Sequence, residues 1–170
     1  METELERLAK ERKARCGAGW SWRTSGLMLL CVTVGAVSGA ATRDAIPVWY
    51  AGLQKPAFNP PGWVFGPVWT TLYLLLGYSM GLAWERGADR LAKTTFLVLL
   101  CVNGLWSLLF FGLRSPGLAL IDIAAYVILL ATWMRMLARH DQTAAWLQVP
   151  HLLWVAFASV LNASIWWLNR

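Results

Sequence analysis

The side chains best suited to bind a ligand are aromatic residues that recur at helical spacing. Phe65, Trp69 and Tyr73 follow one another at intervals of four, so they share one face of a helix. Two further stretches carry such stripes, which consist of Asn103, Trp106 and Phe110, and of His151, Trp154, Ala158 and Leu161. Three aromatic faces with a few polar groups predict a pocket for a flat, mostly apolar molecule. From spacing alone, ordinary core packing is the simpler interpretation, because aromatic stripes more often pack than bind.

Two ionisable side chains in apolar stretches are further candidates. Asp122 would be costly in the middle of a membrane, but near a helix end it can reach water or cap a backbone amide, and we expect this. We expect His151 to be a hydrogen-bonded residue near the inner interface rather than a ligand. The chain has no Ser-His-Asp set and no His or Cys cluster with metal-ligand spacing. Hydrolytic and metal-dependent catalysis therefore have no support, and we predict no metal site.

Membrane helices are the elements that must position these side chains. The chain has 170 residues, of which 58% are apolar and 14% charged, which is too apolar for a soluble domain with one core. Uncharged runs such as the 20 residues between Lys93 and Arg114 are long enough to cross a bilayer. The sequence therefore predicts an all-α membrane protein, a bundle of five transmembrane helices at about residues 25–42, 62–84, 94–113, 117–136 and 144–168.

The basic residues indicate how this bundle is oriented. Residues 1–23 form a polar arm with six Lys and Arg residues, and residues 24–170 form the transmembrane domain. The arm and the two links on its side of the membrane carry 11 Lys and Arg residues, against 4 on the other side. The positive-inside rule then puts the N-terminus inside and the C-terminus outside. The net charge of +6 fits these flanks and a lipid bilayer, and no nucleic-acid groove is predicted.

The first loop, before the second predicted helix, is rich in proline and aromatic residues. Pro60 and Pro61 are unsuited to a helix interior but suit the first turn of a helix that starts there. The sequence predicts a structured first loop on the outer face that acts as a lid. Pro150 is expected to kink the helix at 144–168.

Two other residue types have alternative interpretations. Small residues recur four apart, as Gly35 with Gly39 and Gly77 with Gly81, and they serve either packing within the bundle or a homodimer.

Twelve tryptophans are present, and most are expected in the aromatic belt at the span ends. The nine assigned to the belt are Trp20, Trp22, Trp49, Trp63, Trp84, Trp133, Trp146, Trp166 and Trp167. Trp69, Trp106 and Trp154 are predicted to lie at membrane depth.

Three motifs in order resemble those of the translocator protein family, also called tryptophan-rich sensory proteins (TspO/MBR) or peripheral benzodiazepine receptors. They are WYAGLQKPAFNPPGWVFGPVWTTLY at 49–73, NGLWSLLFFG at 103–112 and AWLQVPHLLWVAFASVLN at 145–162. The resemblance covers nearly all of residues 24–169. It implies a five-helix bundle whose first loop closes over a pocket for tetrapyrroles such as protoporphyrin IX and haem, with no cofactor required. Cholesterol handling is in doubt, because the last helix ends in LNASIWWLNR, without the tyrosine of the sterol pattern.

The resemblance also implies roles for individual residues. Trp49 and Tyr50 would be lid residues, and the pocket wall would comprise Phe65, Trp69, Asn103, Trp106, Trp154 and Ala158. Light-dependent porphyrin breakdown in the family has been attributed to the pair that matches Trp69 and Trp154. Binding or transport of a tetrapyrrole or another hydrophobic small molecule is the leading hypothesis, ahead of a porphyrin-degrading enzyme and of a sensor or scaffold without transport. A bacterial membrane is expected rather than the mitochondrial outer membrane.

Overall fold

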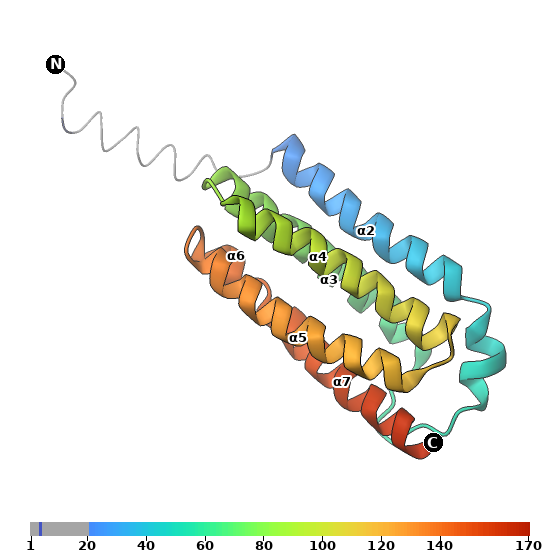
Figure 1. The fold of residues 1–170 in the computed structure, drawn as a ribbon. Helices are drawn as coiled ribbons and strands as arrows, with labels where there is room; N and C mark the ends of the chain where they lie inside the picture. Colours follow the sequence, from blue (N-terminus) through green and yellow to red (C-terminus); the bar gives the residue numbers. More distant parts are fainter. Residues whose placement is uncertain (1–3, 5–20) are drawn as a thin grey trace.

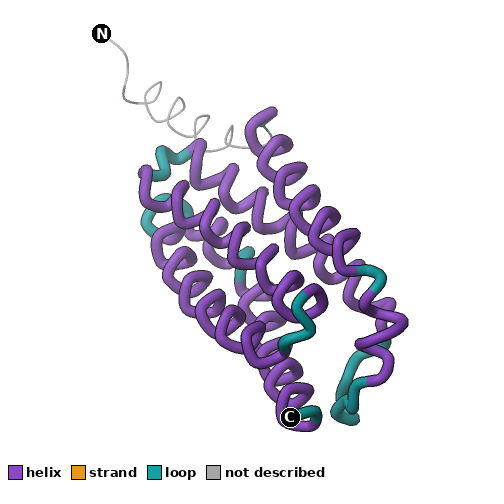
Figure 2. Tube along the Cα trace, turned by 45° about the vertical axis from the view of Figure 1, so that its right-hand side comes forward, coloured by secondary structure: helices purple, strands orange, loops and turns teal. Residues whose placement is uncertain are grey.

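The computed structural model describes Glu4 and residues 21–170, and every long element in this part of the chain is a helix (Figures 1 and 2). The predicted basic arm therefore lies outside the described residues, apart from Glu4 and its last three positions. The described residues contain five long helices. They are α2 (Trp22–Thr42), α3 (Gly62–Glu85), α4 (Arg90–Ser107), α5 (Pro116–Ala138) and α7 (Val149–Leu168), with the short helices η1 (Ile46–Tyr50), η2 (Leu108–Gly112) and α6 (Gln142–Trp146) between them.

Side-chain caps explain where α2 and α4 begin. The side chain of Ser21 accepts a hydrogen bond from the Thr24 amide before α2, and Asp89 accepts one from the Ala92 amide at 2.7 Å before α4. This bond holds the pKa of the Asp89 carboxyl below its ordinary value. Helix α4 consequently begins four residues earlier than predicted. Helix α3 begins at Gly62 directly after Pro61, as the proline pair predicts.

The long helices run side by side, and the start of α2 and the C-terminus lie at opposite ends of the bundle (Figure 1). Helix α2 packs on α3, α4 packs on α5, and α5 packs on α7. Four segments of the described chain are long and apolar enough to cross a membrane: Trp22–Thr42, Arg90–Gly112, Pro116–Ala138 and Gln142–Leu168. Helix α3, with 24 residues, falls outside this set because it is rich in tryptophan, tyrosine and glycine.

The prediction of a single helix kinked at Pro150 is wrong. The segment 144–168 is not one bent helix, because α6 ends at Trp146 and α7 starts at Val149. Pro150 therefore lies in the first turn of α7, where its missing amide leaves no hydrogen bond unmade. Asp141 caps α6 by accepting from the Ala144 amide at 2.9 Å.

The half of the bundle away from the first connection holds most of the core. Trp133, predicted in the aromatic belt, is instead fully buried, and its indole donates to the Ala92 carbonyl at 3.0 Å. Other predicted belt residues, such as Trp63 and Trp146, are largely exposed on the apolar surface. Helix α2 approaches α3 closely, since a Cβ atom at Gly77 would lie 2.5 Å from the Cα atom of Met28. This glycine thus serves packing within the bundle.

Residues 43–61, here called the first connection, cross the end of the bundle where the C-terminus lies (Figure 1). Trp49 and Tyr50 contact the rings of Phe110 and Phe111 with centroids 5.6 to 6.4 Å apart. The Asn169 side chain accepts from the backbone amide of Gln54 and donates to its carbonyl, both at 2.9 Å. The first connection is therefore an ordered segment tied to the end of α7.

Candidate ligand-binding site

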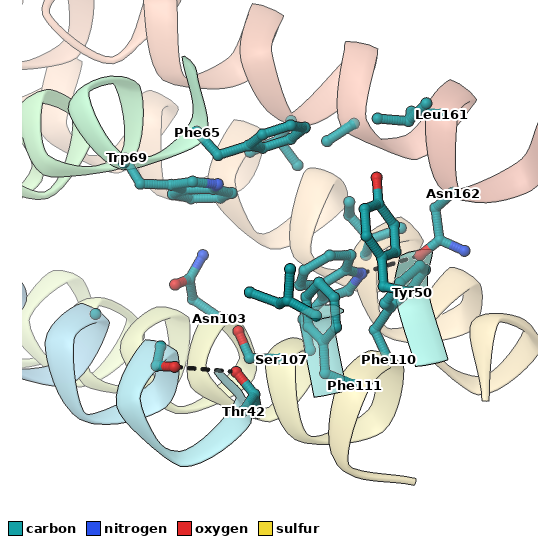
Figure 3. A pocket seen from close by; sticks show the side chains of 18 of the residues that line it. Thr42, Tyr50, Phe65, Trp69, Asn103, Ser107, Phe110, Phe111, Leu161 and Asn162 are labelled. Atoms are coloured by element: carbon teal, nitrogen blue, oxygen red, sulfur yellow. Dashed lines mark hydrogen bonds between the residues drawn. The ribbon is translucent and has the colours of Figure 1, made fainter. Parts of the chain in front are cut away.

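A cavity of about 500 Å³, shown from close by in Figure 3, lies inside the half of the bundle next to the first connection. All five long helices and the first connection contribute to its wall. Its lining is mostly aromatic and aliphatic, with a small number of polar groups, which is the usual character of a small-molecule site. The residues that the sequence singles out can be compared with this wall one helix at a time.

The α3 stripe lies on the wall as its spacing predicts. Phe65, Trp69 and Tyr73 all line the cavity, and Figure 3 shows the Phe65 and Trp69 rings side by side along it. The rings of Trp69 and Tyr73 have centroids 5.7 Å apart. The Tyr73 hydroxyl donates a hydrogen bond to the side-chain oxygen of Asn103 on α4. This bond ties α3 to α4 across the buried end of the cavity.

The α4 stripe forms the facing wall. Asn103 and Trp106 line the cavity together with Phe110, whose ring stacks on that of Trp106 at 5.0 Å. The Trp106 indole donates to the Asn162 side chain at 3.0 Å, and Asn162 donates to the Pro116 carbonyl at 2.7 Å. These bonds connect α4, α7 and the start of α5, so the orientation of the Trp106 ring is fixed by three helices.

The α7 stripe is rotated relative to the prediction. Ala158 and Leu161 line the cavity, but the wall continues through Val155, Asn162 and Ile165 rather than through Trp154. The Trp154 ring lies against Phe65, with centroids 5.9 Å apart, and its indole nitrogen is buried without a hydrogen-bond partner in the described part of the chain. His151 does not line the cavity either.

The two predicted lid residues take different positions. Tyr50 lines the cavity and donates from its hydroxyl to Asn59 at 3.1 Å, while Trp49 packs on Phe110 outside the cavity wall. Burial raises the pKa of Tyr50 above its ordinary value, so its hydroxyl stays protonated as the donor in this bond.

A chain of hydrogen bonds closes the end of the cavity that lies away from the first connection. The Tyr126 hydroxyl lies 3.1 Å from His151 Nε2, and His151 Nδ1 lies 3.2 Å from Gln148 Oε1. Gln148 Nε2 donates to the Leu75 carbonyl and to Ser79 Oγ. His151 and Gln148 are fully buried. The expectation that His151 is a hydrogen-bonded structural residue is confirmed, and it supports the cavity floor through Tyr126.

Asp122 differs from its prediction. It caps no backbone amide, and it is 9% exposed, with one of its carboxylate oxygens buried and without a hydrogen-bond partner in the described chain. It lines the cavity together with Ile123 and Tyr126 from the same helix. Sequence reasoning missed Tyr126, although it lies four residues after Asp122 and so shares its face. It also missed the α2 wall of Gly35, Ala36 and Gly39, which carries no aromatic signal.

Comparisons with known proteins agree with this architecture. Residues 27–168 match the TspO/MBR family. The chain is 42% identical over 144 residues to the tryptophan-rich protein TspO of Archaeoglobus fulgidus, which covers 84% of this chain and 94% of that one. It is 38% identical over 127 residues to the human translocator protein, which covers 69% and 73%, and 35% identical over 144 residues to the protein CrtK of Rhodobacter capsulatus, which covers 82% and 88%. With its four apolar spans the chain is an integral membrane protein, and it belongs to the TspO/MBR family.

Proposed function

We propose that this protein binds tetrapyrroles such as protoporphyrin IX or haem in the cavity and transports them through the membrane. The observation that carries the proposal is the aromatic cavity itself, with Trp69 on one wall and Trp106 on another. A porphyrin is flat and largely apolar, so it gains both from burial and from stacking on such rings. No cofactor is needed for binding of this kind.

The same proposal includes the arrangement in the bilayer. Helix α3 is the fifth span, since 24 residues extend for about 36 Å, which exceeds a hydrocarbon core of about 30 Å. The N-terminus lies inside and the C-terminus outside, in keeping with the distribution of Lys and Arg. The first connection then lies on the outer face and acts as a lid over the cavity.

Replacement of Trp69 tests the binding site. We expect Trp69→Ala to weaken protoporphyrin IX binding about tenfold, because both the buried ring area and its stacking are lost. The measurement is a titration of the purified protein in nanodiscs, followed by porphyrin absorbance so that the lost tryptophan does not alter the signal. Trp63→Ala is the matched control, since Trp63 lies on the same helix but is 76% exposed. Equal affinities of wild type and Trp69→Ala would reject the site.

Asn169 tests the lid. Its two hydrogen bonds to the Gln54 backbone hold the first connection against α7. If each exposed bond contributes about 0.7 kcal/mol, Asn169→Ala should release bound protoporphyrin IX up to about tenfold faster. Stopped-flow dissociation measures this rate, with Arg170→Ala as the neighbouring control. An unchanged rate would mean that exchange does not require the first connection to leave α7.

Light-dependent breakdown and signalling remain weaker alternatives. Breakdown by the indole pair is less well supported than binding, because Trp69 lines the cavity whereas Trp154 lies beside Phe65, off the wall. A sensor role without transport has no specific side-chain arrangement in its favour. Flux of protoporphyrin IX into proteoliposomes distinguishes transport from binding alone.

A further inference from the structure

We propose that Asp122 makes the cavity selective for ligands that carry a protonated amine on an aromatic or other apolar framework, with the cationic nitrogen seated against this carboxylate. The inference rests on the proposed function in one respect, that the cavity is a ligand site. It adds the chemical class that the site prefers and the orientation in which a ligand enters.

The first argument is the missing counter-charge. Asp122 is 9% exposed and lies about 9 Å along α5 from Pro116, the first residue of that helix. No Lys, Arg or His is among the described residues that line the cavity, and one Asp122 oxygen has no hydrogen-bond partner there. A buried carboxylate is costly without a cation or a donor, particularly at membrane depth. A ligand nitrogen can supply both.

The second argument is the hydrogen-bonding polarity of the neighbouring Tyr126. Gln148 must present its nitrogen to the Leu75 carbonyl, because a carbonyl can only accept, so its oxygen faces His151. His151 Nδ1 therefore carries the hydrogen, Nε2 is the acceptor, and the Tyr126 hydroxyl donates to it. Towards the cavity the Tyr126 oxygen can only accept. Tyr73 is in the same state, since its hydrogen is donated to Asn103.

Tyr126 lies one helical turn from Asp122 on the same face of α5, so the two residues present acceptors side by side. This end of the cavity therefore complements a group with several N–H donors. A donor on the wall from another helix is the Asn103 side-chain nitrogen on α4, which Figure 3 shows pointing towards the cavity. A single carboxylate with adjacent phenol oxygens is suited to an ammonium group rather than to an anion.

The third argument is the aromatic wall around this charge. Cations are attracted to the faces of Trp, Tyr and Phe, and the attraction grows when water is excluded. The cavity contains such rings from α3, α4, η2 and α5, namely Phe65, Trp69, Tyr73, Trp106, Phe110 and Tyr126. An aromatic enclosure with one buried carboxylate is the arrangement by which proteins hold organic cations.

The negative charge of Asp122 also determines the orientation in which an acidic ligand binds. A tetrapyrrole carboxylate beside Asp122 would suffer like-charge repulsion at low dielectric, so the propionates must point away from it. Lys55 lies in the first connection, with its ammonium 4.7 Å from the centre of the Tyr50 ring. Tyr50 lines the cavity. The expected orientation therefore has the propionates at the first connection and the opposite edge, which carries no carboxylate, towards Asp122.

A pair of probes that differ in charge tests the proposal. At mildly alkaline pH 9-aminoacridine is protonated, while acridine has the same three-ring framework and is neutral. The protein in phosphatidylcholine nanodiscs is titrated with each, and signal from empty nanodiscs is subtracted to remove partition into lipid. We expect wild type to bind 9-aminoacridine at least about tenfold more tightly than acridine. We expect Asp122→Asn to lose this preference by weakening 9-aminoacridine alone.

The controls separate this inference from the proposed function. Asp44→Asn removes a fully exposed carboxylate outside the cavity and should keep the wild-type preference. Trp69→Ala should weaken both probes. If Trp69→Ala does so but wild type shows less than a twofold preference, or if Asp122→Asn keeps the preference, the amine selectivity is wrong and the binding site stands. If Trp69→Ala changes neither probe, both proposals fall. The wild-type ratio is decisive even if a variant does not fold.

Discussion

Ala158→Trp is expected to abolish protoporphyrin IX binding, with a loss of at least about 100-fold in affinity, while the protein still folds. Ala158 lines the cavity from α7, between Val155 and Asn162 on the same wall. An indole at this position would occupy the space between the α3 and α4 walls that a flat ligand must enter. Because the new ring fills an existing cavity rather than a packed core, the cost in stability should be small.

The matched control for this variant is Ala156→Trp. Ala156 lies on the same helix two residues earlier but is exposed on the outside of the bundle, where an indole adds to the apolar surface. We expect it to bind protoporphyrin IX as wild type does. Porphyrin absorbance titration and thermal unfolding of both variants in the same detergent separate a blocked cavity from a misfolded protein. Binding by Ala158→Trp within threefold of wild type would place the ligand elsewhere.

The sequence was sufficient for those parts of the fold that depend on local chemistry. Uncharged runs located the long helices, and the proline pair predicted the start of α3 at Gly62. The α4 start differed because the Asp89 cap was not recognised. The long segment before the C-terminus divided into α6 and α7 because Pro150 is better accommodated in a first turn than inside a helix.

The candidate site was predicted where one face of a helix was unambiguous. On α3 and α4 the aromatic residues share a face, and both stripes line the cavity. On α7 two faces compete, since Trp154 and Val155 are adjacent residues that point about 100° apart. The face of Val155 and Ala158 faces the cavity, and no property of a single helix sequence shows which rotation its neighbours will select.

The burial of Asp122 could not be predicted from its position near the start of α5. Whether such a carboxylate meets water depends on what covers the end of the helix. Here Asn162 of α7 bonds the Pro116 carbonyl, and the first connection packs on η2 and α7. These contacts join residues far apart in the chain. The same applies to the α2 wall, whose glycines and alanines are indistinguishable in sequence from ordinary packing positions.

Gln148→Leu is expected to lower the free energy of unfolding by roughly 2 to 4 kcal/mol. This is the largest loss of stability expected for any of the variants proposed. Gln148 is fully buried and makes three hydrogen bonds, to Leu75, Ser79 and His151. Leucine has a similar size but removes the hydrogen bond that each of these partners makes with Gln148. The reversible unfolding transition in detergent measures the effect. Gln142→Leu is the control, because Gln142 is exposed at the start of α6.

The position of Gln148 explains why its loss should reach the cavity as well. Helix α3 makes its close contacts with α2 and α6, and Gln148 bonds it to the start of α7 below the cavity. The same residue fixes the His151 tautomer that accepts from Tyr126. Gln148→Leu should therefore also reduce the preference for 9-aminoacridine over acridine, because the Tyr126 hydrogen is no longer held by His151. A destabilised variant that kept the full preference would show that Asp122 acts without the oriented phenol.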